Sequence, residues 1–199
     1  MLAPKENSSK ATLRRTALAR RQALPAAEIA QRSQQLCEQF FEHFPVAQWR
    51  WLHVFLPIGS KQEPDTWRII RRIWAEGLAT RLAVPVVPAH GRALQHYELT
   101  PDTPLHENRW GISEPAPAAA VPPTALDAVL VPLLAVDAAG RRVGYGAGYY
   151  DRFLAQCRPG TPFIGLSVLA GAPVPGIADV HPGDVPLTAC LSPDGLQRF

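Results

Sequence analysis

The spacing of apolar residues divides the chain into alternating helices and strands. Apolar side chains at helical intervals predict helices over 9–23, from Pro25 to beyond Phe40, over 65–77 and over 148–157, with Ser8 or Ser9 capping the first and Asp65 or Thr66 the third. Short apolar runs predict strands at 51–57, 79–87, 94–99, 126–136, 162–169 and 185–191. This alternation predicts the α/β fold class: one domain over 1–199 with a largely parallel, mixed sheet covered on both faces. Residues 1–7 are expected to be flexible.

Pro132 interrupts the most apolar of these strands. Proline has no main-chain N–H to donate, so within sheets it is confined to edges, first positions and bulges. The strand over 126–136 is therefore expected either to bend at Pro132 or to end early. Either event comes just before a glycine-rich stretch, at the edge of the sheet where α/β proteins bind their ligands.

Length and composition are typical of a soluble globular protein. Hydrophobic residues make up 47% and charged residues 19% of the 199 residues, and the longest apolar run, 128–136, is too short to cross a bilayer. The N-terminus lacks the apolar core of a secretory signal, and Cys37, Cys157 and Cys190 form no CxxC pair. These features predict a protein of the reducing cytoplasm with no membrane partner.

The charge balance leaves more than one interpretation open. The chain has 20 Lys and Arg against 17 Asp and Glu, a net charge of +3. This excess could favour phosphate-bearing or polycarboxylate ligands, and it is equally compatible with an ordinary solvated surface. The first helix carries Lys10, Arg14, Arg15, Arg20 and Arg21, which keeps a nucleic-acid-binding module among the hypotheses.

Glycines at 144, 146 and 148 stand directly before a predicted helix, in the stretch VGYGAGYYDRFL. Glycine permits positive φ and removes side chains, so main-chain N–H groups and the positive end of the helix can form a site for phosphate oxygens. Arg142, expected on the surface of this loop, adds a bidentate contact. The spacing matches neither a Walker loop nor the dinucleotide fingerprint. A simple tight turn would also account for it.

Asp151 follows in the first turn of the predicted helix. A carboxylate at this position interacts favourably with the helix dipole without any ligand. If phosphates lie over the loop, the same carboxylate is placed to hold Mg²⁺, with Asp184 as the second candidate.

The stretch VLVPLLAVDAAGRRVGYGAGYYDRFL resembles the signature of the 5-formyltetrahydrofolate cyclo-ligases, also called 5,10-methenyltetrahydrofolate synthetases. The resemblance extends, in the family's order, to KATLRRTALARRQAL, FLPIGSKQEPDT, RWGISEP and GDVPLTACLSP. It implies a three-layer α/β/α fold and an enzyme that uses ATP and Mg²⁺ to cyclise 5-formyltetrahydrofolate to 5,10-methenyltetrahydrofolate, releasing ADP and phosphate. It further implies a monomer that acts on a small-molecule folate, with or without a polyglutamate tail, and that has no nucleic-acid partner.

The resemblance also implies roles for individual residues. ATP would be bound by Lys10, Arg14, Arg142, Gly144, Tyr145, Gly146, Ala147, Gly148, Tyr149 and Tyr150, and magnesium by Asp151 and Asp184. The folate would be bound by Leu56, Glu63, Trp110 and Tyr150, and the catalytic residues would be Arg142 and Tyr149. Taken without the family, Lys10, Arg14 and Arg21 could form a solvated basic stripe, Glu63 a helix-entry acid beside Asp65, and Trp110 a core residue.

The chemistry implied by the resemblance needs few acid–base groups. Phosphoryl transfer depends mainly on positioning and charge stabilisation, which agrees with the lack of a recognisable Ser/His/Asp or Cys/His set. His53, His90, His96, His106 and His181 show no metal-ligand spacing and are expected to be surface or core residues.

The sequence departs from the family pattern at several positions. Ala147 stands where relatives often have glycine or lysine, Val136 where phenylalanine is common, Leu94 where methionine is frequent, and Gly183 where histidine or tryptophan is usual. These changes bear more on the folate than on ATP. The alternative hypothesis is therefore a protein of the same fold that binds a folate or nucleotide without turnover.

Overall fold

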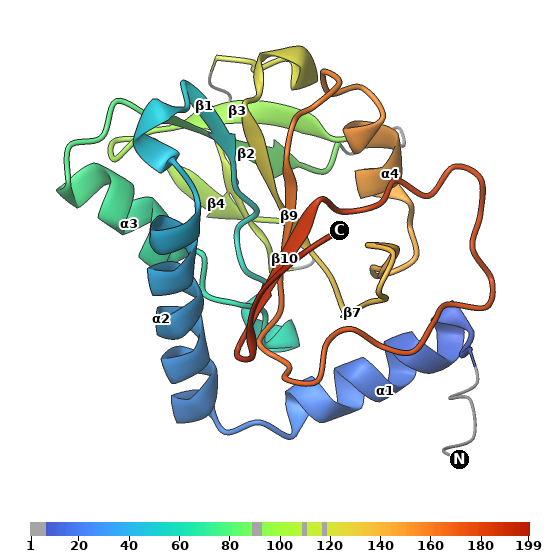
Figure 1. Cartoon of the computed structure of the whole chain (residues 1–199). Helices are drawn as coiled ribbons and strands as arrows, with labels where there is room; N and C mark the ends of the chain where they lie inside the picture. Colours follow the sequence, from blue (N-terminus) through green and yellow to red (C-terminus); the bar gives the residue numbers. More distant parts are fainter. Residues whose placement is uncertain (1–6, 89–92, 109–110, 117–118) are drawn as a thin grey trace.

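Seven strands form a central sheet in the order β11-β10-β9-β6-β1-β2-β3 (Figure 1). They are β1 (Trp51–His53), β2 (Arg81–Val86), β3 (Gln95–Leu99), β6 (Ala128–Pro132), β9 (Phe163–Leu166), β10 (Ala189–Ser192) and β11 (Gly195–Arg198). The five strands from β10 to β2 pair in parallel, whereas β11 and β3 are antiparallel edge strands. The computed structural model describes residues 7–88, 93–108, 111–116 and 119–199. The prediction of a largely parallel, mixed sheet is confirmed.

The helices begin close to where the sequence predicted them. They are α1 (Lys10–Gln22), α2 (Ala26–His43), α3 (Trp67–Ala75) and α4 (Tyr149–Leu154), and η1 (Val46–Gln48), η2 (Gly59–Lys61) and η3 (Pro123–Ala125) are short 3₁₀ helices. The Ser9 side chain caps α1 by accepting a hydrogen bond from the N–H of Thr12. Thr66 is the N-cap of α3, but its hydroxyl donates instead to the carbonyl of Phe55. α4 is shorter than the predicted 148–157.

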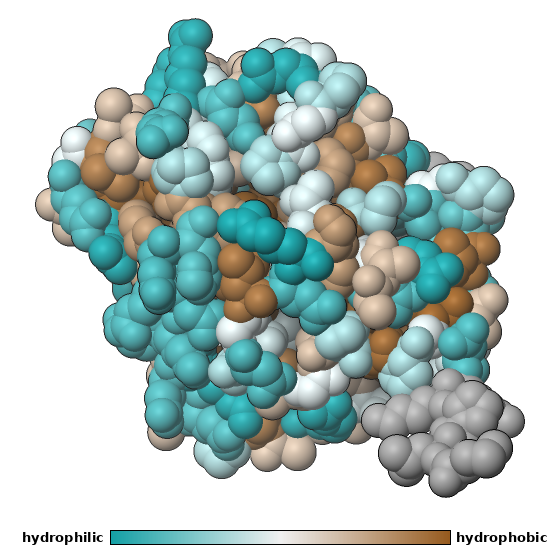
Figure 2. Space-filling view, in the orientation of Figure 1, coloured by the Kyte–Doolittle hydropathy of each residue, from teal (hydrophilic) through white to brown (hydrophobic). Residues whose placement is uncertain are grey.

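Alternate residues of the strands face opposite layers, which gives the sheet a core on each side. Leu82 and Leu130 belong to a cluster with residues of α2 and α3, whereas Val129 packs in a second cluster with Phe153 of α4. A smaller cluster joins α1 to Leu134 beyond the end of β6. The outward side of α2 is mostly hydrophilic in the space-filling view (Figure 2), as its amphipathic spacing predicts. The arrangement is a three-layer α/β/α fold.

The strand predicted over 126–136 is two strands, because β6 ends at Pro132 opposite Leu166 of β9. The chain resumes as β7 (Ala135–Val136), which pairs antiparallel with β8 (Arg142–Val143) in a separate hairpin. Of the two expected outcomes at Pro132, early termination is the one that occurs. The hairpin leads directly into the glycine-rich loop.

Three short features were not predicted from the sequence. They are the hairpin of β4 (Leu105–Glu107) with β5 (Ser113–Pro115), the pairing of β7 with β8, and the edge strand β11. Runs of two to four residues are too short to show periodicity. No helix in the described ranges has both the length and the apolarity needed to span a membrane.

Candidate active site

A cavity of about 340 Å³ opens where the central parallel strands end. Its wall includes Phe55 and Leu56 after β1, Val87 after β2 and Pro132 at the end of β6. From the neighbours β1 and β6 the chain crosses over in opposite directions, to β2 on one side and to β9 on the other. Switch points of this kind are where α/β sheets bind ligands, and the sequence predicted a ligand site at this edge.

The cavity brings together the site residues named from the sequence, as far as the structure describes them. Its lining includes Lys10, Arg14, Leu56, Glu63, Arg142, Gly144, Tyr145, Gly146, Ala147, Gly148, Tyr149, Tyr150, Asp151 and Asp184. Trp110 lies outside the described residues, so its role in folate binding stays a prediction. Residues from α1, the glycine loop, α4 and the segment after β1 thus meet at one place.

The glycine loop needs glycine at two of its three positions. Gly146 has φ 101° and Gly148 has φ 67°, whereas Gly144 and Ala147 are not among the residues with positive φ. A Cβ at Gly146 would lie 3.2 Å from Nη2 of Arg14, so a side chain there would crowd the guanidinium. Because Ala147 does not have positive φ, its methyl group fits the backbone of this loop.

The main-chain N–H groups of the loop are available to a ligand. From Gly144 to Gly148, none of them donates a hydrogen bond to a residue in the described part of the chain. Gly148 is the N-cap of α4, so the loop runs into the positive end of a helix. A simple tight turn would use some of these groups internally, and this loop does not.

Two of the basic candidates contact the loop and the carboxylates beside it. Nε of Arg14 donates to the carbonyl of Gly144 at 2.9 Å, and Nζ of Lys10 forms an ion pair with Asp184. Burial alone would raise the pKa of the Asp184 carboxyl, but hydrogen bonds from Lys10 and the His181 N–H, with the charge of Lys10, lower it overall. Lys10 and Arg14 are therefore part of the site and not a free basic stripe.

Arg142 is buried, which corrects the expectation of a surface loop residue. It is 8% exposed, its Nη2 donates to Oδ1 of Asp151 at 2.8 Å, and its Nη1 donates to the carbonyl of Val185. Burial lowers the pKa of Arg142, and Asp151 opposes this effect. Asp151 also accepts from the N–H of Val185 at 3.1 Å. The ion pair ties β8 to the start of α4, and the two hydrogen bonds to Val185 tie both to the segment after Asp184.

Glu63 is joined to the loop through Tyr145, and Arg21 lies behind both. The Tyr145 hydroxyl donates to Oε1 of Glu63 at 2.5 Å, and the N–H of Ile58 donates to Oε2 at 2.8 Å. Burial raises the pKa of Glu63, although these hydrogen bonds act against it. Glu63 is 5% exposed and Arg21 2%, so Arg21 is not part of a solvated basic stripe.

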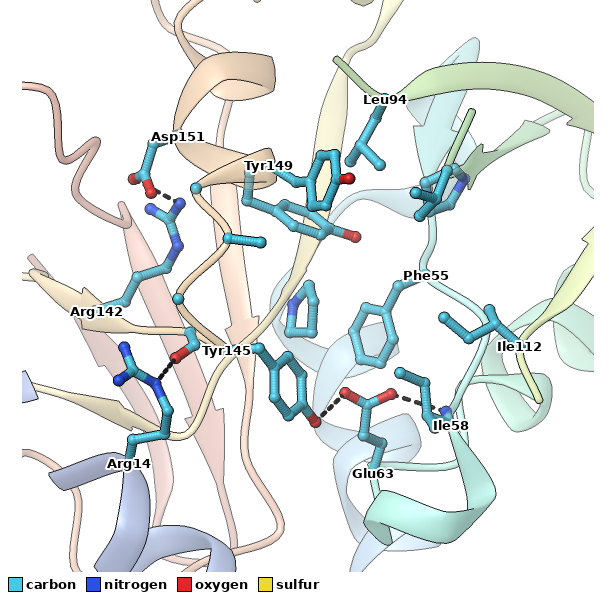
Figure 3. Close-up of a pocket in the computed structure, with 18 of the residues that line it drawn as sticks. Arg14, Phe55, Ile58, Glu63, Leu94, Ile112, Arg142, Tyr145, Tyr149 and Asp151 are labelled. Atoms are coloured by element: carbon cyan, nitrogen blue, oxygen red, sulfur yellow. Dashed lines mark hydrogen bonds and ion pairs between the residues drawn. The ribbon is translucent and has the colours of Figure 1, made fainter. Parts of the chain in front are cut away.

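The cavity has a charged half and an apolar half. Arg14, Arg142 and Asp151 lie on one side of the close-up view and Phe55, Ile58, Leu94 and Ile112 on the other, with Tyr145 and Tyr149 between them (Figure 3). The hydroxyl of Tyr150 also belongs to this region. It is buried without a hydrogen-bond partner among the described residues, and burial raises its pKa well above the usual value.

Comparison with known proteins identifies the family. The 5-formyltetrahydrofolate cyclo-ligase family model matches residues 6–174. The chain is 33% identical to the 5-formyltetrahydrofolate cyclo-ligase of Escherichia coli strain K12 over 68% of its own length and 74% of that enzyme, and 32% identical to that of Mycolicibacterium smegmatis over 70% and 71%. The chain belongs to this family.

A solved structure of a 5,10-methenyltetrahydrofolate synthetase has the same overall fold as this chain. The Aquifex aeolicus 5,10-methenyltetrahydrofolate synthetase superposes with a TM-score of 0.76 at 24% identity, covering 95% of this chain and 92% of that one. Similarity at this level of identity establishes the fold. The α/β/α prediction that followed from the family resemblance is thereby confirmed.

Within this cyclo-ligase fold, sequence reasoning missed several lining residues. They are Phe55, Ile58, Pro85, Val87, Ile112, Glu114 and Pro132. From the sequence, Arg21 is one of the basic residues of α1 with no predicted role in the site. Its spacing of seven residues from Arg14, two turns of helix, was the available signal that both share a face. Leu94, one of the departures from the family pattern, does line the apolar half.

The histidines agree with their expected place in core or surface. His53 and His96 are buried against Phe153, with ring centroids 4.7 and 4.0 Å from it, and burial lowers the pKa of His96 to about 4. His106 and His181 are exposed, and His90 lies outside the described residues. The described ranges contain no group of three or more His, Cys, Asp or Glu side chains that could hold a metal.

Proposed function

We propose that the chain is an ATP- and Mg²⁺-dependent 5-formyltetrahydrofolate cyclo-ligase that forms 5,10-methenyltetrahydrofolate, ADP and phosphate in this cavity. Membership of the family and the named activity of its relatives support the folate cyclo-ligase reaction. The main support for the use of ATP is the loop from Gly144 to Gly148, because its main-chain N–H groups have no acceptor among the described residues. Such donors at a helix start are suited to phosphate oxygens.

The charged half of the cavity is the proposed phosphate site. Lys10, Arg14 and Arg142 add cationic donors around the loop, and Tyr149 and Tyr150 begin the helix behind it. Charge-assisted hydrogen bonds from such groups are about twice as strong as neutral ones. Arg142 and Tyr149 remain the proposed catalytic residues, because a developing charge on the transferring phosphoryl group would be closest to this side.

The donor set fits magnesium. Mg²⁺ is usually held by one or two carboxylates together with phosphate oxygens and water. Asp151 and Asp184, which line the cavity together with the loop, supply two carboxylates. Bound Mg²⁺ would offset the negative charge of the phosphates during transfer. In the structure each carboxylate is paired with a cation, Arg142 for Asp151 and Lys10 for Asp184. Those cations are the ones proposed to turn toward the phosphates.

The apolar half is the proposed folate site. Phe55, Leu56 and Ile58 offer apolar surface to a flat ring system. Glu63, a residue that is 5% exposed, offers a carboxylate that is held by two donors. A carboxylate fixed in this way is a good acceptor for the N–H groups of a pterin ring. The hydroxyl of Tyr150, which has no partner in the described part of the chain, is available to the substrate.

The reaction would proceed in two steps. The formyl oxygen attacks the γ-phosphorus of ATP, and the bond to the bridging oxygen breaks so that ADP leaves. The nitrogen N10 of the folate then attacks the activated formyl carbon and loses its proton, and the carbon–oxygen bond breaks to release phosphate. Neither step needs more from the chain than positioning and charge stabilisation, which is what a preorganised set of cations and main-chain donors supplies.

An absorbance assay for the methenyl product tests this proposal. Product and ADP should both form only when 5-formyltetrahydrofolate, ATP and Mg²⁺ are all present. Arg14→Met should raise the KM for ATP, whereas Arg15→Met, at the exposed neighbouring position, should not. ATP hydrolysis that is indifferent to the folate would contradict the proposal. Tight folate binding without product would favour the alternative of a non-catalytic binding protein.

The remaining expectations stay proposals. We propose that the chain acts in the cytoplasm as a monomer, on a small-molecule folate with or without a polyglutamate tail, and without a nucleic-acid partner. A nucleic acid would need exposed cations on α1. Three of the basic residues there are engaged or buried instead: Lys10 pairs with Asp184, Arg14 contacts the loop, and Arg21 is buried.

A further inference from the structure

Arg21 is buried behind the cavity although it is charged and does not line it. It lies on α1, is 2% exposed, and its Nη2 donates to the hydroxyl of Tyr145 at 2.5 Å. Its guanidinium carbon lies 5.8 Å from the centre of the Tyr145 ring. Its Nε has no hydrogen-bond partner in the described ranges. Burying a guanidinium that is only partly satisfied is costly, so the position calls for a reason.

The contacts of Tyr145 show what the guanidinium does there. A phenol has one proton to donate. Because the Tyr145 oxygen accepts from Arg21, its own proton is directed to Oε1 of Glu63. The second oxygen of Glu63 accepts from the N–H of Ile58 at 2.8 Å. Each carboxylate oxygen therefore has one protein donor, and the orientation of the carboxylate is held from both sides.

This chain of hydrogen bonds joins the two halves of the cavity. Arg21 belongs to α1, Tyr145 to the glycine loop, and Glu63 to the segment between β1 and α3. The loop that faces the charged half is thus linked by one side chain to the carboxylate that faces the apolar half. We propose that Arg21 is a positioning residue that fixes Tyr145 and, through it, presents Glu63 to the folate. The inference rests on the proposed function.

The charges near Glu63 give the proposal a pH signature. Arg21 and Lys61 lower the pKa of the Glu63 carboxyl, as does the hydrogen bond from Tyr145, while burial raises it. Tyr150 from α4, Arg14 from α1 and Glu114 from β5 line the same cavity. Without Arg21, the pKa of Glu63 should rise further. Folate binding that needs the carboxylate should then be lost at a higher pH as the solution is acidified.

The decisive experiment compares Arg21→Met with Arg21→Lys and with the exposed control Arg15→Met. Arg21→Met should raise the KM for 5-formyltetrahydrofolate about tenfold at pH 7.5, the loss expected for one hydrogen bond to a charged group. Its kcat and its KM for ATP should change less than threefold. The acid limb of kcat/KM should move to higher pH, and Arg21→Lys should restore part of the affinity. Arg15→Met should match the original chain in every measurement.

A double-variant cycle separates positioning through Tyr145 from general support of the fold. Tyr145→Phe removes the shared hydroxyl, so adding Arg21→Met to it should raise the folate KM less than twofold further. Independent, additive effects would overturn the proposal, as would an Arg21→Met variant with an unchanged KM and unchanged pH profile. If Arg21→Met does not fold, Tyr145→Phe alone must reproduce the shift of the acid limb, and failure to do so overturns the proposal.

The proposed function can fail separately. An original chain that forms no methenyl product refutes the cyclo-ligase proposal and leaves the link through Tyr145 testable. The titration of Glu63 can then be followed by carbon NMR of labelled glutamate carboxyls, assigned with Glu63→Gln. Arg21→Met must raise that pKa and Arg15→Met must not. An unchanged titration would overturn the role of Arg21.

Discussion

Gly148 offers the sharpest test of the glycine loop. It is the N-cap of α4 and has φ 67°, a backbone conformation that side chains rarely adopt. Valine at this position would be strained, and its Cβ would lie 2.9 Å from Nη1 of Arg152. Arg152 can swing away because its guanidinium is the end of a flexible side chain. The backbone of residue 148 has no such freedom, so the loop itself must change shape.

The expected loss of stability follows from these two effects. A side chain in the left-handed region costs roughly 1–2 kcal/mol. Displacing Arg152 disturbs its hydrogen bond of 3.0 Å to the carbonyl of Ala147, an exposed contact worth about 0.5–1 kcal/mol. Gly148→Val should therefore lower the free energy of unfolding by about 1.5–3 kcal/mol. For a chain of this size that corresponds to a fall in Tm of about 3–12 °C.

Gly148→Val should also weaken ATP binding, because a change in the shape of the loop redirects its main-chain N–H groups. If the loop relaxes to negative φ at residue 148, the neighbouring N–H groups no longer point together at a phosphate. Each charge-assisted hydrogen bond that is lost should weaken ATP binding about tenfold. Titration calorimetry with ATP and Mg²⁺, at a temperature well below the Tm, measures this directly.

Gly77 provides the matched control. It follows α3, has φ 64°, lies outside the cavity lining, and has no atom within 4 Å of an added Cβ. Gly77→Val therefore carries the same backbone strain without touching the loop and should lose about 1–2 kcal/mol of stability with unchanged ATP affinity. A folded Gly148→Val variant with the original ATP affinity would refute the phosphate cradle. Equal losses of affinity in both variants would also refute it, because strain would then be the cause.

The remaining substitutions separate stability from activity. Arg142→Ala removes the buried guanidinium that pairs with Asp151, so it should lower the free energy of unfolding, measured in urea, by about 3 kcal/mol. The variant should also lose its enzymatic activity. An unchanged urea midpoint would contradict this expectation. The raised folded-state pKa of Glu63 means that its contribution to stability is full below the unfolded value of about 4.3 and is lost as pH rises through the folded value. Glutamine does not titrate, so the unfolding free energy of Glu63→Gln minus that of the original chain should increase from pH 4 to pH 7. The variant should also lose folate turnover. A difference in unfolding free energy that does not change with pH would count against a raised pKa of Glu63. Tyr150→Phe removes a buried hydroxyl with no partner in the described ranges, so it should not lower stability and should raise it by at most about 1 kcal/mol, while kcat/KM for the folate falls. An unchanged kcat/KM would remove Tyr150 from the substrate contacts.

The elements that sequence reasoning located best are those with local signals. The cap at Ser9, the stripe of Ile69, Ile70 and Ile73, and the stop of β6 at Pro132 each follow from a few neighbouring residues. β11 has four residues and β8 two, and their pairing depends on partners elsewhere in the chain. Such strands are defined by tertiary contacts, so their own sequence does not predict them.

The burial of charged residues was the main property that local reasoning could not supply. Arg142 follows the turn that Asp137 organises, and polar residues around such turns suggest a surface loop. In the fold, β8 pairs with β7, and Arg142 of β8 donates hydrogen bonds to Asp151 and to the carbonyl of Val185. Arg21 is similar, because one basic residue on a basic helix looks like its exposed neighbours until the opposing loop is known.

The pairing of opposite charges explains how one cavity can keep cations for phosphates and carboxylates for magnesium before either ligand arrives. The family resemblance assigned Lys10 and Arg142 to phosphates and Asp184 and Asp151 to metal as two separate sets. In the fold they form two pairs, Lys10 with Asp184 and Arg142 with Asp151. Because an unpaired charge at a partly buried site is costly, each pair keeps the cavity stable without ligand. A metal–nucleotide complex carries both signs of charge, so it can satisfy both members of each pair at once. ATP alone, or Mg²⁺ alone, would leave one member of each pair without a partner, and we therefore expect the two to bind more tightly together than either does separately.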